Sequence, residues 1–395
     1  MTAACPAIRN RLPLLALVFS LLLGLTALLC LTGCQEQAPP PRASENGGWA
    51  STESYTLSLA TSWPTNYPIF SDSLKRLAAS VATMSRGQLT IEIDSANKHK
   101  APFGVLDMVK AGQYDMGHSA SYYWKGKDSS TMFFTTMPFG MTAPEQYAWF
   151  YHGGGLELMQ KVYARHGVYS YPGGNTGVQM GGWFRQEINR LDDLKGLKMR
   201  VPGFAGEVLA KLGVIVTNIP PGELYTALDR GTIDALEWVG PGLDLAMGFH
   251  KIARFYYTGW HEPAAELQFL INKETFDSLP HHLQEILRVA MQSAALDLYA
   301  RHYHASAENW ATIRTDYPDV QVRSFGPEIL TALQAANDQL LTARAADNPL
   351  FKEVRDSQQA YLTKVRAWTL LSDFAYLNAV EQGQDPASLV KESKR

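Results

Sequence analysis

The residue that most suggests chemistry in this chain is Arg200. Leu197, Met199 and Val201 alternate around it and predict a short strand, and a helical pattern follows from about Glu207. An arginine guanidinium presents a planar fork of donors that a small carboxylate meets with two parallel hydrogen bonds, and free N–H groups at a helix start would add to such a site. A lone arginine more often forms a structural or surface ion pair. Other residues are therefore needed to show whether Arg200 binds a ligand.

Side chains with amide or carboxylate oxygens lie in other predicted strands. Asn175 and Gln179 belong to a glycine-rich run that predicts a strand around Gln179. Glu237 ends one apolar strand, and Gln268 lies in another. Oxygen ligands alone suit a hard cation such as Na⁺ or Ca²⁺ and not zinc or copper, and a cation beside Arg200 would give a carboxylate two positive partners. The amides could equally satisfy buried backbone groups, and their spacing leaves that alternative open.

The first 33 residues predict a secretory signal peptide. Arg9 and Arg11 form its basic start, residues 14–31 are apolar, and the segment ends in Leu-Thr-Gly-Cys34, which resembles a bacterial lipobox. Cleavage before Cys34 would make this cysteine the lipidated first residue. An ordinary transmembrane anchor is the alternative, because the apolar run is just long enough to span a bilayer.

All three cysteines, Cys5, Cys30 and Cys34, lie within or at the end of this segment. The mature domain therefore has no thiol, which excludes catalytic-cysteine, zinc–thiolate and iron–sulfur sites. Residues 34–54 combine the lipidated cysteine with a flexible tether rich in Pro, Ser and Gly. The whole chain has a formal net charge of −3 and no basic stripe, so nothing indicates nucleic-acid binding.

From residue 55 onward, strand and helix patterns alternate. Residues 56–60 and 89–93 alternate as strands do, with apolar residues at helical spacing between them. The segments 105–116 and 224–235 are weakly similar, since each reads as a helix, a glycine stop and an aspartate that opens a strand. This alternation predicts α/β layers with parallel sheets, in a chain long enough for two lobes.

The two similar segments lead into residues that could face a ligand. The first leads to Tyr122 and Tyr123, and the second leads to Glu237 and Trp238. Ligands in open α/β sheets bind beyond the carboxyl ends of the strands. The sequence therefore places aromatic rings and one carboxylate where a small molecule would bind.

The last third of the chain predicts long helices. They cover about 280–313, 327–345 and 351–379, with a strand at 319–324 after the first of them. The last helix is amphipathic and needs a partner surface, on its own chain or on another.

Three motifs together resemble the extracytoplasmic solute-binding subunit of a TRAP transporter (DctP-type), in particular the branch that binds 2-oxo acids and lactate. The motifs are Gly174–Phe184, Leu194–Gly203 and Asp234–Pro241, and the resemblance covers about residues 55–385. It implies a two-lobed, periplasmic-binding-protein-like α/β fold with long C-terminal helices, which closes on its ligand and performs no catalysis.

The same resemblance implies an organisation of the mature chain. Residues 55–145 with about 236–272 are expected to form lobe 1, and about 146–235 with 273–326 to form lobe 2. Residues 327–395 are expected to form C-terminal helices. The family branch implies a homodimer that exchanges these helices, which would give the last one its partner.

The resemblance also assigns roles to individual residues. Arg200 would clamp the ligand carboxylate. The substrate-binding set is Arg200, Gln179, Asn175, Tyr123 and Trp238, with Tyr122 as the alternative to Tyr123. The set that holds a Na⁺ or Ca²⁺ ion, which also touches the ligand, is Gln179, Glu237, Trp238 (through its backbone carbonyl) and Gln268.

Two other functions are alternatives to this one. The run His152-Gly-Gly-Gly155 mimics an oxyanion loop, but the nearest serine motif, around Ser119, lacks the final glycine of a hydrolase elbow. His261-Glu262 is followed by a proline and does not form a zinc-protease helix. A hydrolase, or a lipoprotein that stacks sugars on its many aromatic residues, remains the alternative. The sequence favours a periplasmic, lipid-anchored protein that captures a small 2-oxo or 2-hydroxy monocarboxylate for TRAP membrane subunits.

Overall fold

The computed structural model describes residues 53–381. The chain divides before Ser54, and the unit that begins there is the one described below. The predicted signal peptide, Cys34 and nearly all of the tether lie outside the described residues. Within the described part, none of the helices combines the length and the apolar character that crossing a bilayer requires.

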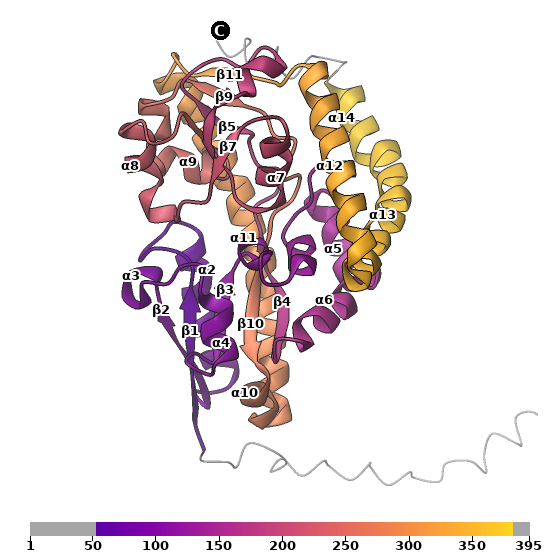
Figure 1. Cartoon of the computed structure of the whole chain (residues 1–395). Helices are drawn as coiled ribbons and strands as arrows, with labels where there is room; N and C mark the ends of the chain where they lie inside the picture. The colour runs from indigo at the N-terminus through magenta and orange to yellow at the C-terminus, as the bar shows by residue number, and fades with distance from the viewer. Residues whose placement is uncertain (1–52, 382–395) are drawn as a thin grey trace, which may run out of the picture. The chain divides into compact units, whose positions relative to one another are not determined.

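The first lobe is built on a five-stranded sheet (Figure 1). Its spatial order is β2 (Leu89–Asp94), β1 (Tyr55–Thr61), β3 (Met116–Ser119), β10 (Glu266–Asn272) and β4 (Val168–Asn175). β1 pairs in parallel with β2 and β3, whereas β10 runs antiparallel to both β3 and β4. The helical segments of this lobe are α2 (Phe70–Met84), α3 (Ala96–His99), α4 (Val105–Lys110), η1 (Ser121–Trp124), η2 (Ser129–Phe134), α5 (Ala143–His152), α6 (Gly155–Ala164) and α10 (Lys273–Ser278).

The second lobe is built on a six-stranded sheet. Its spatial order is β11 (Gln321–Arg323), β9 (Phe255–Tyr257), β5 (Gly182–Phe184), β8 (Ala235–Leu236), β6 (Lys198–Arg200) and β7 (Ile215–Thr217). β5 is antiparallel to both β8 and β9, and the other neighbours pair in parallel. The helical segments here are η3 (Leu191–Leu194), α7 (Gly203–Lys211), η4 (Pro221–Glu223), α8 (Leu224–Asp229), α9 (Pro241–Met247) and η5 (Phe249–Lys251).

The two similar segments of the sequence fall in different lobes, as predicted. One contains α4 and leads into β3, and the other contains α8 and leads into β8. Gly112 and Gly231 follow these helices with φ of 68° and 70°, the left-handed conformation that ends a helix at little cost for glycine. Each aspartate ties its strand to a neighbour, because Asp115 accepts from Ser58 N and Asp234 accepts from Lys198 N.

Two short linkers connect the sheets and lie side by side. Residues 176–181 lead from β4 to β5, and residues 258–265 lead from β9 to β10. Two backbone hydrogen bonds join the linkers to each other, from Thr176 N to Ala265 O at 3.1 Å and from Gln179 N to Glu262 O at 2.9 Å. A third, from Gly181 N to Tyr257 O at 2.7 Å, joins the first linker to the end of β9. The strand predicted around Gln179 is therefore wrong, because this segment pairs across the junction and β5 begins only at Gly182.

The expected lobe boundaries need correction. β4 lies in the segment 146–235 that was expected in lobe 2, but it belongs to the first sheet. β9 lies in the segment 236–272 that was expected in lobe 1, but it belongs to the second sheet. Alternating strand and helix patterns do not reveal which sheet a strand joins. The chain crosses between the sheets at the two linkers and once more through α11 (His281–Asp316), which leads from β10 to β11.

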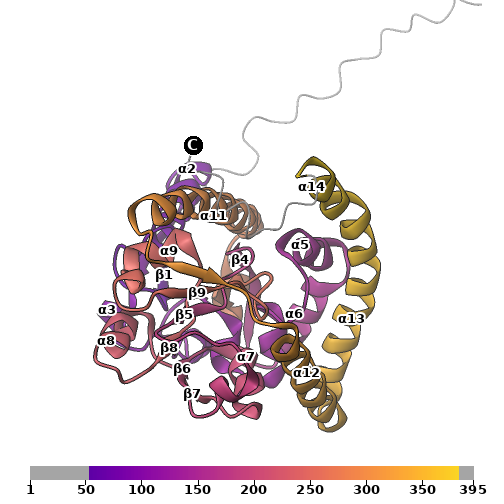
Figure 2. The same ribbon diagram turned by 90° about the horizontal axis from the view of Figure 1, so that it is seen from above.

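Four helices remain. The first of them spans both lobes, and the other three follow the last strand. The four are α11 (His281–Asp316), α12 (Pro327–Asp347), α13 (Pro349–Thr369) and α14 (Ala375–Val380), with a π-helical turn at Leu370–Phe374 between the last two. α11 contacts α2 and β4 of the first lobe and α9 of the second. α12 packs on α7, and α13 returns to α5 and α6, so the C-terminal helices lie along one flank of the molecule (Figures 1 and 2).

The close contact of the linkers predicts a sharp requirement for glycine at position 259. A Cβ atom on Gly259 would lie 1.9 Å from the carbonyl oxygen of Gln179, so the Gly259→Ala variant must move one linker away from the other. We expect the free energy of unfolding to fall by about 1–3 kcal/mol, the cost of forcing an extra methyl into a packed place. Urea denaturation measures this.

The matched control for this variant is Gly126→Ala. Gly126 is also exposed, and a Cβ there meets nothing within 4 Å. This control should change the free energy of unfolding by less than about 0.5 kcal/mol. Equal stability of the two variants would contradict the tight contact between the linkers.

Candidate functional site

Arg200 ends β6 and is fully buried. Its Nη1 donates to the main-chain carbonyl of Glu237 at 2.7 Å, and its Nε donates to the carbonyl of Ile219 at 3.3 Å. The Trp238 ring lies 5.3 Å from the guanidinium carbon. Nη2 is buried and has no hydrogen-bond partner. Two of the three guanidinium nitrogens are thus fixed by backbone, and the third remains available to an acceptor.

Glu237 follows β8, the neighbour of β6, and its N–H donates to Arg200 O at 3.0 Å. Its carboxylate lies 3.5 Å from Arg200 Nη1 and 3.6 Å from His261 Nε2, measured to different oxygens. Both carboxylate oxygens are buried and accept no hydrogen bond. A buried carboxylate of this kind needs another positive partner, because desolvation of an unpaired charge is expensive.

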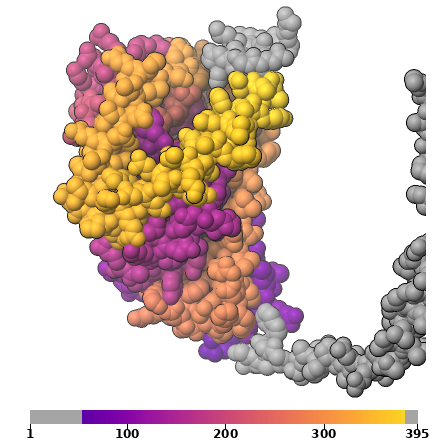
Figure 3. Space-filling model, turned by 90° about the vertical axis from the view of Figure 1, so that its right-hand side faces the viewer, coloured from indigo at the N-terminus to yellow at the C-terminus, as the bar shows by residue number. Residues whose placement is uncertain are grey.

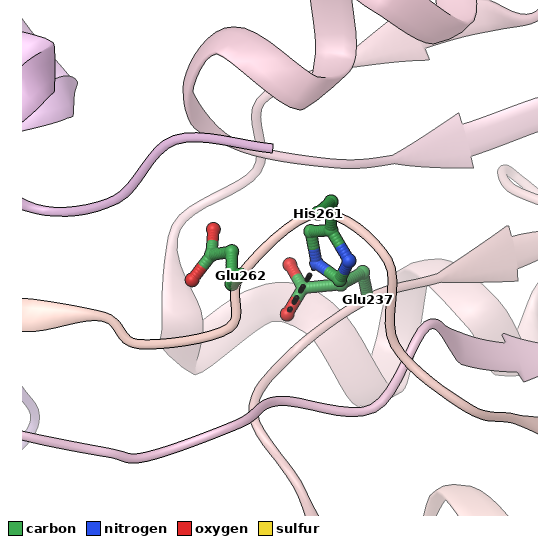
Figure 4. Close-up of side chains that lie close together, drawn as sticks. All are labelled: Glu237, His261 and Glu262. Atoms are coloured by element: carbon green, nitrogen blue, oxygen red, sulfur yellow. Dashed lines mark ion pairs between the residues drawn. The ribbon is translucent and has the colours of Figure 1, made fainter. Parts of the chain in front are cut away.

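Glu237, His261 and Glu262 converge in the interior (Figure 4). The last two come from the second linker, and one ligand atom from each residue lies within 4.8 Å of the others. Glu262 Oε2 and both ring nitrogens of His261 have no hydrogen-bond partner. Burial raises the pKa of Glu237 well above its usual range, although Arg200 opposes this shift. Burial, with the nearby Glu237, also raises the pKa of Glu262 to about 8.

Gln179 adds an amide oxygen to this region. Its N–H donates to Glu262 O at 2.9 Å, its Nε2 donates to Thr176 Oγ1 at 2.9 Å, and its Oε1 is buried without a donor. Unpaired oxygens of Glu237, Glu262 and Gln179 make a donor set of hard ligands, which fits a cation of the Na⁺ or Ca²⁺ type. The same residues would hold that ion and leave it accessible to a ligand beside Arg200.

Asp244 in α9 holds the turn that follows the site. Its carboxylate accepts from the N–H groups of Val239 and Gly240 at 3.2 and 2.9 Å. It also accepts from Trp183 Nε1 and Tyr256 OH, both at 2.9 Å. Met180 N of the first linker donates to Val239 O at 2.8 Å, so the linker and this turn are joined. The backbone around Trp238 is therefore fixed from two sides.

Aromatic rings from the first lobe face the site. Tyr122 and Tyr123 lie on η1, and burial raises the pKa of Tyr123 to about 12 although the Arg200 charge opposes the shift. Tyr122 packs against Gly203 at the start of α7, where a Cβ would lie 3.0 Å from its ring. Both tyrosines thus lie close enough to Arg200 for its charge to act on them, and the geometry gives no reason to choose between them as the ligand contact.

Two predicted site residues are engaged elsewhere, and their predicted roles need correction. Gln268 lies on β10 within the first sheet, and its Oε1 accepts from Ser170 Oγ at 3.2 Å on β4. Asn175 donates both amide hydrogens, to Gln146 Oε1 and Glu266 Oε2, and accepts from Gly177 N. Gln268 was expected to be the fourth ligand of the cation. The structure instead places the carboxylate of Glu262 beside that of Glu237.

The sequence does not mark His261 and Glu262 as site residues, because their spacing fits no zinc-protease helix. The signal that could have found them is their position. They form a polar pair inside an otherwise apolar connection between two strands, opposite the glycine-rich connection that carries Gln179. The hydrolase alternative gains no support, since the Ser119 hydroxyl is fully buried and lies 2.5 Å from the Ser62 hydroxyl.

The raised pKa of Glu262 predicts a pH dependence of the metal-free protein. The folded-state pKa of Glu262 is about 8, whereas the ordinary pKa of a glutamate is 4.5. The contribution of this group to stability is therefore complete below pH 4.5 and is lost as the pH rises toward 8. Relative to Glu262→Gln, the wild type should therefore lose about 1–4 kcal/mol of unfolding free energy between pH 4.5 and pH 8. Urea denaturation in EDTA measures it, and parallel profiles of the two proteins would contradict the burial of an ionisable Glu262.

Comparison with known proteins identifies the family. Residues 59–348 match the model of the bacterial extracellular solute-binding proteins, family 7 (DctP). A monocarboxylate 2-oxoacid-binding periplasmic protein of Nostoc sp. is 39% identical over 327 residues, which span 82% of this chain and 89% of the relative. This agreement covers both lobes and the linkers between them.

Solved structures give the same result. A TRAP periplasmic solute-binding protein of Colwellia psychrerythraea, with bound calcium and pyruvate, has 61% identity and a TM-score of 0.82 over 83% of this chain and 100% of its own. Its counterpart from Pseudoalteromonas atlantica, with sodium and pyruvate, has 60% identity and a TM-score of 0.81 over 82% and 99%.

A third solved structure comes from Bordetella bronchiseptica. It is a mixed-occupancy dimer with copurified calcium and picolinate, and it has 31% identity and a TM-score of 0.81 over 84% of this chain and 100% of its own. The resemblance seen in the sequence is thereby confirmed, and so is the two-lobed α/β fold. The chain belongs to family 7 of the bacterial extracellular solute-binding proteins and is a solute-binding protein of the TRAP type.

Proposed function

We propose that this protein captures a small 2-oxo monocarboxylate, with pyruvate as the reference ligand, and that Arg200 binds its carboxylate. The observation that carries the proposal is the free Nη2 of a fully buried Arg200 beside a cluster of unpaired carboxylate oxygens. A guanidinium held rigidly by two backbone carbonyls is preorganised for an anion and loses little entropy on binding. The names of relatives that bind 2-oxo acids or pyruvate support the same ligand class.

The second half of the site is a bound cation. Glu237, Glu262 and Gln179 would hold it, with the carbonyl of Trp238 as a further oxygen ligand. When bound, it supplies a second positive charge to the carboxylate and polarises an adjacent 2-oxo or 2-hydroxy oxygen. Its protein ligands lie beside Arg200, so a ligand with two neighbouring oxygens can meet both at once. We therefore expect 2-oxo acids to bind more tightly than simple carboxylates.

Closure of the lobes would complete the site. Arg200 and Glu237 belong to the second sheet, while Tyr122 and Tyr123 come from the first lobe. The linkers 176–181 and 258–265 are the segments at which one lobe can move relative to the other. A ligand that contacts both lobes stabilises the closed form, because it binds that form better than the open one.

We further infer a lipid anchor at Cys34 and a dimer formed through the C-terminal helices. Exposed apolar side chains gather along the end of α13, the π-helical turn and α14, and they are Trp368, Leu370, Leu371, Phe374, Tyr376, Leu377 and Val380. This segment lies across one face of the molecule (Figure 3). An apolar stripe of this size is typical of a protein interface. The anchor would keep the protein near the TRAP membrane subunits that it serves.

A thermal-shift panel tests the ligand. Pyruvate with a cation present should raise the melting temperature, whereas succinate and glucose should not, because binding to the native state alone stabilises it by mass action. At a ligand concentration of about 100 times Kd the gain is about 2.7 kcal/mol of unfolding free energy. No shift with any 2-oxo or 2-hydroxy acid would reject the proposed ligand class, and a shift with glucose would favour the sugar-binding alternative.

The variant that tests the role of Arg200 in this panel is Arg200→Lys. Lysine keeps the charge but cannot donate to Glu237 O and to a carboxylate in the same fixed fork. Pyruvate affinity should fall by at least about tenfold in isothermal titration calorimetry, and Arg200→Ala should cost about 2–5 kcal/mol of binding free energy. Binding that is unchanged in both variants would assign Arg200 a structural role.

The interface is tested separately by Leu371→Glu. Leu371 is 73% exposed, so a charge there should not change the stability of one folded chain but should disrupt an apolar interface. Sedimentation should show a dimer for the wild type and a monomer for this variant. Asp373→Lys, on the same turn, is the control that should remain dimeric. A wild-type protein that is a monomer at all concentrations would overturn the proposed dimer.

A further inference from the structure

The charges around the proposed cation are not balanced by the protein alone. Glu237 and Glu262 are both 1% exposed, and the Arg200 guanidinium lies 3.5 Å from the Glu237 carboxylate. His261 is also buried, and its Nε2 lies 3.6 Å from Glu237 Oε1. Asp244 in α9 is a further buried carboxylate, and its oxygens are satisfied by four donors.

Two carboxylates against one guanidinium leave one uncompensated negative charge. A bound monocarboxylate adds another. A monovalent cation would then leave the buried group with a net negative charge, whereas a divalent cation would make it neutral. Because burying an uncompensated net charge is unfavourable, the divalent ion suits this site better than the monovalent ion.

The donor atoms favour one divalent ion over others. The unpaired atoms of Glu237, Glu262 and Gln179 are oxygens, and Ca²⁺ takes six to eight such ligands in flexible geometry. Mg²⁺ requires strict octahedral geometry and keeps several waters, which a buried site does not supply. His261 Nε2 lies 3.6 Å from Glu237 Oε1 in the same cluster, where the imidazole can help to orient that carboxylate.

We propose that Glu262 makes this a calcium site and selects Ca²⁺ over Na⁺. The proposal rests on the cation site described under the proposed function, and it adds the identity of the ion and the residue that decides it. Similarity to known proteins leaves the choice open, because two relatives of about equal identity carry calcium in one case and sodium in the other. The second carboxylate, not the fold, decides between the ions.

The experiment uses the full chain, stripped of metal by EDTA and exchanged into a choline buffer. Ca²⁺ and Na⁺ are titrated separately by calorimetry, and also by displacement of Tb³⁺, whose luminescence the buried Trp238 and Trp260 can sensitise. Ca²⁺ should bind at least about 100-fold more tightly than Na⁺, because its double charge is attracted by two carboxylates. Equal affinities, or tighter binding of Na⁺, would overturn the proposal, and so would tighter binding of Mn²⁺ or Zn²⁺ than of Ca²⁺.

Glu262→Gln identifies the residue responsible. It keeps the size and one oxygen donor but removes the charge, so Ca²⁺ affinity should fall at least about 30-fold while Na⁺ affinity falls less than about tenfold. Glu266→Gln is the matched control. Glu266 is a fully buried glutamate of the same region, but its carboxylate binds Gly174 N and Asn175 Nδ2 and lies outside the cluster.

The Glu266 variant should keep the Ca²⁺ to Na⁺ affinity ratio of the wild type, even if it is less stable. A ratio that Glu262→Gln leaves unchanged would refute the role of Glu262. These ion titrations contain no organic acid, so they separate the two proposals. Calcium selectivity without pyruvate binding would reject the proposed ligand but keep the proposed calcium site. Pyruvate binding that depends on Na⁺ alone would keep the ligand and reject the calcium site.

Discussion

The site depends on the hydrogen bond from the Arg200 guanidinium to the main-chain carbonyl of Glu237. The two residues end neighbouring parallel strands, and their backbones pair as well, from Glu237 N to Arg200 O. The same strand pairing therefore fixes the cationic group and the carboxylate beside it. The sheet holds the backbones of both residues, and two backbone carbonyls hold the guanidinium, so this part of the site is positioned before any ligand binds.

The second constraint is the contact between the two linkers. They carry Gln179 and Glu262 to the edge of the rigid pair, and their backbones bond to each other at that point. The approach is so close that Gly259 and Gly181 leave no room for a Cβ atom. Segments that are far apart in the sequence thus act as one structural element, and the proposed ion ligands Gln179 and Glu262 lie where they touch.

The sequence was informative wherever a local pattern decided the outcome. Strand alternation before Arg200 and Glu237 located both residues at strand ends, and the three motifs led to the family and to the two-lobed fold. It failed where the outcome depended on which segments meet in space. Gln268 has the right chemistry but faces Ser170 within the first sheet, and Glu262 lies in a connection without periodicity. The lobe boundaries failed for the same reason, because β4 and β9 join sheets that local patterns cannot distinguish.

The bond between Met180 N and Val239 O has a consequence for how the protein releases what it binds. It ties the first linker to the turn after Glu237, so the cluster of ion ligands belongs to the second lobe and to the linkers. The first lobe contributes the tyrosines of η1. If the acid and the ion bind as proposed, a rotation that withdraws the first lobe would uncover the organic acid while the ion ligands stay together. The ion would then be a resident part of the receptor, and only the acid would be exchanged in each transport cycle.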